Sequence, residues 1–224
     1  MKDLTFTQEY TLCVLNKVKK NKDILYEGKY PGGIAISAFL ELLISDKIGF
    51  DDKKKVILKG SAENDKEYLN IVCKDILNLK PKTLKIWIEY YLAGLSSKPI
   101  KAIVNAAINS LIDNECVSIE KKNGLFKDHI TYNTEISQVD YIVEKLRAEL
   151  LENGEITMET VILTSLLQQS DILKDYFSKH EHQLLKARIE EIKKSEIWAK
   201  ASIIKEILDE LYTLLIVVLI PGII

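Results

Sequence analysis

The segment IAISAFLELLIS, residues 34–45, is apolar on nearly every side when it is written as an α-helix. A helix without a polar face belongs at the centre of a protein, with other elements packed around it. Helical periodicity continues on both sides, at about residues 5–19, 65–79, 83–95, 98–114, 138–151, 157–168, 172–194 and 195–219. We therefore expect a mainly α fold, a helical bundle in which residues 34–45 are central.

Two short stretches depart from the helical period. Residues 48–50 and 56–58 are β-prone runs separated by a charged turn, which predicts a hairpin. Residues 117–132 alternate in polarity, and Asn123-Gly124 between the two runs is a strong hairpin-turn signal. Residues 26–33 contain Pro31 and three glycines, which favour a loop. The bundle is therefore expected to carry two short β-hairpins and an aromatic, glycine-rich loop.

The strongest apolar run lies near the C-terminus, at residues 211–220. It is shorter than the roughly 20 residues that cross a bilayer, so we expect a buried helix around which the bundle packs. An interfacial anchor is the alternative. No repeat, low-complexity segment or long linker divides the chain, which favours one domain over residues 1–224. Residues 1–10 lack the apolar stretch of a secretory signal, so we expect a protein that stays inside the cell.

Composition argues against nucleic acid as the main partner. The formal net charge is −2, and of 31 basic residues only Arg147 and Arg188 are arginines. Lysine is a flexible point charge that suits diffuse attraction to an anionic surface better than bidentate readout. Cys13, Cys73 and Cys116 are odd in number, far apart and set in apolar helical patterns, which predicts reduced core residues.

No combination of residues has the signature of a catalytic, metal or cofactor site. His180 and His182 are two residues apart and would lie on different faces of a helix, and His129 stands alone in a predicted hairpin. Surface histidines explain all three. We therefore expect no enzyme, no cofactor and no metal, and we look for a binding function.

The first candidate binding feature is a helix start at residues 96–101, SSKPIK. Serine caps, a proline in the first turn and the two lysines Lys98 and Lys101 together could hold an anion. A purely structural helix start is the alternative.

The second candidate is the tip of the second hairpin. Leu125 and Phe126 directly follow the turn and are flanked by Lys121, Lys122 and Lys127. Burial of each large apolar side chain contributes roughly 1.5 to 3 kcal/mol, and each lysine adds about 1 kcal/mol at an anionic surface. This tip could insert into a membrane interface. Alternatively, the two apolar side chains fold back onto the helical core.

Several short motifs follow one another along nearly the whole chain. They are LT (4–5) with Glu9, AFLEL (38–42), DKIGF (46–50), WIE (87–89), LIDNECV (111–117), EKKN (120–123), LF (125–126) and SDIL (170–173). In this order they resemble the Golgi phosphoprotein 3 family, peripheral membrane adaptors that bind phosphatidylinositol 4-phosphate. The resemblance implies a helical domain with a buried C-terminal helix, a headgroup pocket beside the second hairpin, and insertion of that hairpin's tip.

The resemblance also implies roles for particular residues. The aromatic position of the family's pocket falls at Tyr26 and one basic position at Lys101, whereas two arginine positions fall on Ala35 and Val104. These departures remove charge-assisted hydrogen bonds to a phosphate. We therefore expect a divergent or prokaryotic member that attaches to the cytoplasmic face of a membrane through an anionic lipid, with phosphatidylinositol 4-phosphate as one possible ligand.

A winged-helix-like module is the alternative, because a helix at about 98–114 followed by a glycine-tipped hairpin also resembles a wing. Such a module would bind protein or nucleic acid without a membrane. The scarcity of arginine and the acidic net charge disfavour binding to a phosphate backbone.

Overall fold

The computed structural model describes residues 1–18, 25–26, 29–61, 63–93, 98–122, 129–152, 155–192 and 194. The elements, in chain order, are α1 (Phe6–Val18), α3 (Lys29–Ile44), β1 (Ile48–Phe50), β2 (Val56–Leu58), α4 (Glu67–Asn78), α5 (Leu84–Ala93), α6 (Lys98–Asp113), β3 (Val117–Lys122), β4 (His129–Thr134), α7 (Ile136–Leu151), α8 (Met158–Gln169), the 3-10 helix η1 (Leu173–Asp175) and α9 (Lys179–Ile192). The predicted mainly α fold with two antiparallel hairpins is confirmed.

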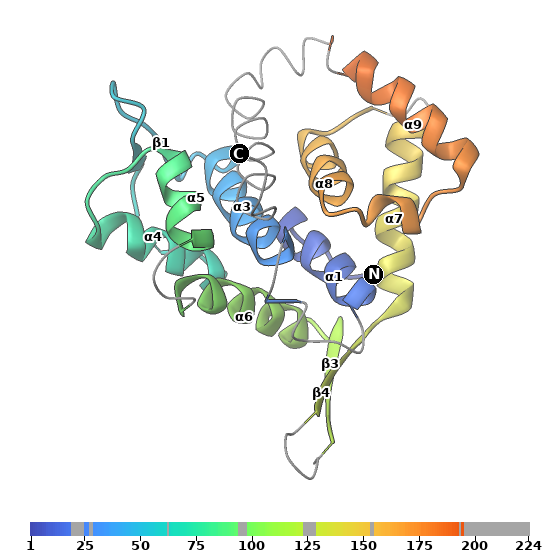
Figure 1. The fold of residues 1–224 in the computed structure, drawn as a ribbon, viewed down its shortest axis with the longest axis horizontal. Helices are drawn as coiled ribbons and strands as arrows, with labels where there is room; N and C mark the ends of the chain where they lie inside the picture. Colours follow the sequence, from blue (N-terminus) through green and yellow to red (C-terminus); the bar gives the residue numbers. More distant parts are fainter. Residues whose placement is uncertain are drawn as a thin grey trace, which may run out of the picture.

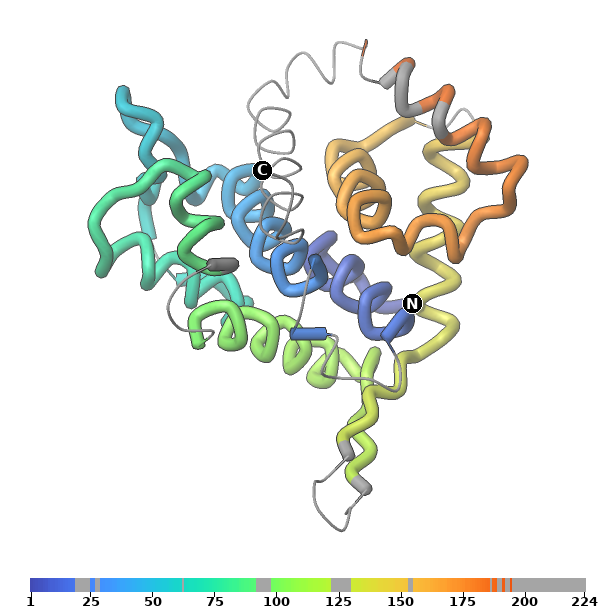
Figure 2. Tube along the Cα trace, in the orientation of Figure 1, coloured from blue at the N-terminus to red at the C-terminus, as the bar shows by residue number. Residues whose placement is uncertain are grey.

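Helices α1 and α3 pack against each other in the middle of the described fold (Figure 1). On one side lie α4, α5 and α6, which contact α3; on the other lie α7 and α8, which contact α1, with α9 against α7. The prediction that residues 34–45 are central is confirmed, because α3 is buried from Pro31 to Leu40 without interruption. The second hairpin, β3–β4, extends away from the helices (Figure 2).

Thr5 and Gln8 have the spacing that predicts a capping box, and helix α1 begins with this motif. The backbone N–H of Gln8 donates to Thr5 Oγ1 at 3.3 Å, and the backbone N–H of Thr5 donates to Gln8 Oε1 at 3.1 Å. Two amides at the helix start are thereby satisfied by side chains. This fixes the direction in which α1 enters the core.

The expected loop over residues 26–33 is wrong from Lys29 onward, where α3 has already begun. Pro31 lies in the first turn, where its missing N–H costs no hydrogen bond. Gly33 lies where α3 packs against Tyr10 of α1: a Cβ there would be 2.5 Å from Tyr10 Cζ and closer to the hydroxyl oxygen. Glycine therefore serves close helix packing at this position, not a turn.

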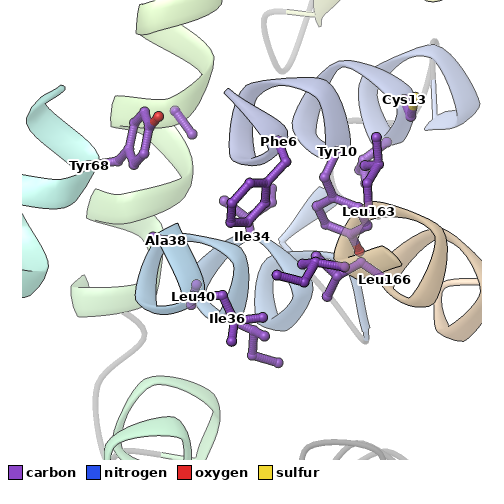
Figure 3. Packing of buried hydrophobic residues seen from close by; sticks show 14 of the residues in the cluster. Phe6, Tyr10, Cys13, Ile34, Ile36, Ala38, Leu40, Tyr68, Leu163 and Leu166 are labelled. Atoms are coloured by element: carbon purple, nitrogen blue, oxygen red, sulfur yellow. The ribbon is translucent and has the colours of Figure 1, made fainter. Parts of the chain in front are cut away.

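The core between these helices is shown in Figure 3. Phe6 and Tyr10 of α1 lie against Ile34 of α3, and Leu163 and Leu166 of α8 complete the contact. Tyr10 is fully buried, and its hydroxyl shares a short hydrogen bond with Ser170 at the end of α8. Burial of large side chains from three helices explains why α1, α3 and α8 pack together.

Both hairpins have the expected strands. In the first, Ile48 pairs with Leu58 and Phe50 with Val56. In the second, the register runs from Val117↔Thr134 to Lys122↔His129. The base of the second hairpin is closed between α6 and α7, because the backbone N–H of Glu135, just after β4, donates to Cys116 O, just before β3, at 2.8 Å.

The expected continuous helix over residues 172–194 is wrong in its first part. It is divided into η1 and α9 by a turn at Tyr176–Ser178. A second capping box restarts the helix, because the backbone N–H of Ser178 donates to Glu181 Oε2 and that of Glu181 to Ser178 Oγ. Arg147 of α7 then connects these pieces through Glu181 Oε1, at 2.9 Å, and Tyr176 O, at 2.8 Å.

All three cysteines are free and buried, as predicted. The predicted helix at 195–219 and the apolar run at 211–220 lie outside the described residues. Among the described helices, none is both long and apolar enough to cross a membrane.

Candidate functional site

Two of the predicted site residues come together beside the second hairpin. Tyr26 precedes α3, and Lys101 lies one turn inside α6. The Lys101 ammonium nitrogen is 5.9 Å from the centroid of the Tyr26 ring. At this distance a cation over an aromatic face gains electrostatic energy from the ring.

Asn105 completes this contact from the next turn of α6. The Tyr26 hydroxyl donates to Asn105 Oδ1 at 2.5 Å. Residues four apart lie on one face of a helix, so Lys101 and Asn105 both face Tyr26. Lys101 and Asn105 are exposed, whereas Tyr26 is half-buried. The site is therefore open to solvent on the α6 side.

The second hairpin reaches the same tyrosine through Tyr132 of β4. Burial, the largest effect, raises the pKa of Tyr26, and its interaction with the Tyr132 side chain raises that pKa further. Tyr26 is thus a neutral phenol at physiological pH. It offers a hydroxyl and an aromatic face, and no charge.

The strand register shows what else lies near Tyr132. Its partner across the hairpin is Ile119, and the next pair on that face is Lys121 and Ile130. Ile119 is 43% exposed and Lys121 is exposed. One face of the hairpin therefore continues from the site as an accessible apolar strip that includes a lysine.

Lys98 is the first residue of α6 and is exposed, with Pro99 in the first turn as predicted. The serines expected to cap this helix lie outside the described residues, as do Leu125, Phe126 and Lys127 of the hairpin tip. The backbone of Lys122 ends β3. The roles given to these side chains stay predictions.

Ala35 and Val104 are core residues. Their side chains are 3% and 0% exposed, respectively. Both positions therefore contribute packing to the core and add no charged group to the site.

Sequence reasoning missed Asn105 and Tyr132. Each had a signal: Asn105 is one helical turn after Lys101, and Tyr132 alternates with Ile130 on one face of a predicted strand. Neither signal says which face meets residue 26, because that depends on how the segment before α3 packs.

Within the described ranges, no three His, Cys, Asp or Glu side chains gather closely enough to hold a metal ion. His180 and His182 lie in the first turn of α9, and His129 opens β4.

A comparison with models of protein families finds a match over most of the chain. The family model described as Golgi phosphoprotein 3 (GPP34) matches residues 32–211, which is more than half of the chain. The matched range includes α6 and both hairpins, whereas Tyr26 precedes it. No curated protein is significantly similar to the chain in sequence.

Proposed function

Because the chain belongs to the Golgi phosphoprotein 3 family, we propose that it is a peripheral membrane-binding protein without catalytic activity. It attaches to anionic or phosphoinositide-containing membranes through Tyr26, Lys98 and Lys101. Leu125 and Phe126 of the second hairpin insert beside that site, with Lys121, Lys122 and Lys127 around them. The protein acts as a single domain, residues 1–224, on the cytoplasmic face of the membrane.

The observation that carries this proposal is the placement of Lys101 over Tyr26, 5.9 Å from the ring centroid, on the open side of α6. Lys101 has no carboxylate partner among the described residues. An exposed ammonium that no carboxylate neutralises in the described part of the chain is available to an anion from outside. Each such lysine contributes about 1 kcal/mol at an anionic surface.

The hairpin supports the same orientation. Its exposed face, with Ile119 and Lys121, is continuous with Tyr132 at the site. An apolar surface with lysines at its border is typical of segments that lie in a membrane interface. Headgroup site and hairpin would then meet the same membrane surface.

The winged-helix alternative has one observation in its favour: α6 is followed directly by β3 and β4, the order of a helix and a wing. The positions of the arginines disfavour it. Arg147 is paired with Glu144 and Glu181, and Arg188 with Glu191. Both are thus engaged away from α6, so the helix and wing lack the guanidinium groups typical of phosphate-backbone binding.

Co-sedimentation with liposomes tests the proposal. The purified protein is mixed with neutral phosphatidylcholine vesicles, anionic vesicles, and vesicles containing phosphatidylinositol 4-phosphate. We expect binding to the anionic and phosphoinositide vesicles that weakens as salt is raised. A Leu125→Asp, Phe126→Asp double variant should lose binding, and Lys101→Ala should weaken it about three- to tenfold.

Lys85→Ala is the matched control, because Lys85 is an exposed lysine on α5, away from the site. It removes the same charge and should leave binding unchanged. Equal losses in Lys85→Ala and Lys101→Ala would mean that only net charge matters and that α6 carries no site. Absence of binding to every vesicle would refute membrane attachment and leave the protein-interaction alternative.

A further inference from the structure

The site beside the second hairpin contains more neutral hydrogen-bonding groups than charges. Lys98 and Lys101 are the cations at the start of α6. Lys101 lies over the ring of Tyr26, whose phenol in turn contacts the carboxamide of Asn105 and the phenol of Tyr132. The balance of these groups determines which anion the site fits.

The side-chain amide of Asn105 has hydrogen-bond donors that the described structure does not use. Its carbonyl oxygen already accepts the Tyr26 hydroxyl, at 2.5 Å. Its amide nitrogen donates to no acceptor in the described part of the chain, and the side chain is exposed. Two N–H groups, held in place by the bond on the other side of the amide, are therefore available to an oxygen of a ligand.

The charges of the site are few and flexible. A phosphomonoester carries about −1.5 to −2 at neutral pH and is held best by several fixed, charge-assisted hydrogen bonds. Lysine supplies a mobile point charge in place of the arginine fork. Arg147, on α7, and Arg188, on α9, are both engaged with glutamates, and Ala35 and Val104 are buried. Such a site matches one negative charge better than two or three.

We propose that this site recognises a singly charged phosphodiester headgroup whose other polar groups are hydroxyls. Phosphatidylglycerol and unphosphorylated phosphatidylinositol share this chemistry. Lys101 meets the phosphate, and the amide of Asn105 and the hydroxyl of Tyr132 meet the polyol. The inference rests on the proposed membrane attachment and adds the class of headgroup.

The test compares vesicles of equal total negative charge in a phosphatidylcholine background. Their anionic component is phosphatidylglycerol, phosphatidylinositol, phosphatidylserine or phosphatidylinositol 4-phosphate. We expect phosphatidylglycerol and phosphatidylinositol vesicles each to bind about three- to tenfold more tightly than phosphatidylserine vesicles, the gain of one or two hydrogen bonds. Phosphatidylinositol 4-phosphate at equal charge should give no gain over phosphatidylinositol.

Asn105→Ala isolates the amide. It should weaken binding to the two polyol lipids more than binding to phosphatidylserine vesicles, and so remove the preference. Asn109→Ala is the matched control, because Asn109 is an exposed asparagine one turn further along the same helix. It should change neither quantity. Tyr132→Phe, which keeps the ring and removes the hydroxyl, should lower the preference in part, and the circular dichroism of each variant verifies its fold.

Different results would refute the headgroup assignment and the proposed membrane attachment. Binding that follows charge alone, with no difference between phosphatidylserine and the polyol lipids, would overturn the headgroup assignment while membrane attachment stands. So would tighter binding to phosphatidylinositol 4-phosphate than to phosphatidylinositol at equal charge, or an equal loss from Asn105→Ala on every vesicle. Absence of binding to all anionic vesicles would refute the proposed function itself.

Discussion

The substitution Gly33→Ala tests whether the close packing of α1 against α3 requires glycine at position 33. In an unobstructed helix this substitution would stabilise the protein by about 1 kcal/mol. Here the added Cβ would lie 2.5 Å from Tyr10 Cζ, whereas ordinary contact begins at 3.4 Å. The Tyr10 ring would have to retreat by nearly an ångström. The Tyr10 side chain is fully buried and hydrogen-bonded to Ser170, so any shift of the ring disturbs its neighbours.

Overpacking costs roughly 1 to 3 kcal/mol, and a clash with a fully buried, hydrogen-bonded ring belongs to the upper part of that range, about 2 to 3 kcal/mol, against a gain of about 1 kcal/mol in helix propensity. We expect a net loss of about 1 to 2 kcal/mol and a fall in Tm of roughly 2–8 °C for a chain of this size. Urea unfolding followed by circular dichroism measures the free energy, and an unchanged m value shows that the unfolded state is the same.

A double-mutant cycle with Tyr10→Leu assigns the cause. The smaller side chain makes room for the Cβ, so the penalty of Gly33→Ala should vanish in that background, and the helix propensity of alanine should appear as a gain. The reasoning is refuted if Gly33→Ala is neutral or stabilising alone. It is equally refuted if its cost is the same with leucine at position 10.

The remaining predictions concern charge and thiols. Hydrogen bonds from the backbone N–H of Ser178 and from Arg147 lower the pKa of Glu181 to about 2, from an ordinary 4.5. The stability that Glu181 contributes is therefore complete above pH 4.5 and is lost as the pH falls towards 2, so Glu181→Gln should flatten the acid side of a plot of Tm against pH. Burial raises the pKa of Cys13, Cys73 and Cys116. A thiol reagent at neutral pH should label the three cysteines only as fast as the protein unfolds, and rapid labelling of the native state would contradict their burial.

Local sequence rules predicted the elements whose signals are local. The capping box at Thr5 and Gln8 depends on residues three apart, and both hairpins depend on alternation within a few residues. The start of α3 was predicted too late because Pro31 and Gly33 were taken as loop residues. Proline is tolerated in the first turn of a helix, and Gly33 serves the packing against Tyr10, about twenty residues earlier in the chain. The break before α9 had a local signal, the Ser178 and Glu181 capping box, which the helical period of the surrounding residues obscured.

The candidate site could be predicted only in part, because only some of its residues have a signal in the sequence. Lys101 stands out near the start of a predicted helix, and the resemblance to a family points to Tyr26. The contact of Tyr26 with Asn105 and Tyr132 joins three segments that lie about eighty and a hundred residues apart in the chain. Periodicity and residue spacing cannot predict a contact between segments so far apart in the sequence. Such a contact depends on how α6 and the second hairpin pack beside the residues before α3.

Trp87 has a spectroscopic consequence. Its indole is fully buried on α5, packed near Phe39 of α3, with the Lys82 ammonium 4.1 Å from the ring centroid. Its fluorescence is therefore that of an indole screened from water and from dissolved quenchers, with a fixed positive charge over the ring. In a Trp198→Phe variant, which leaves Trp87 as the single tryptophan of the chain, a change in this emission when vesicles are added would report a shift of α5 against α3. It would reveal that a contact at the surface alters the interior.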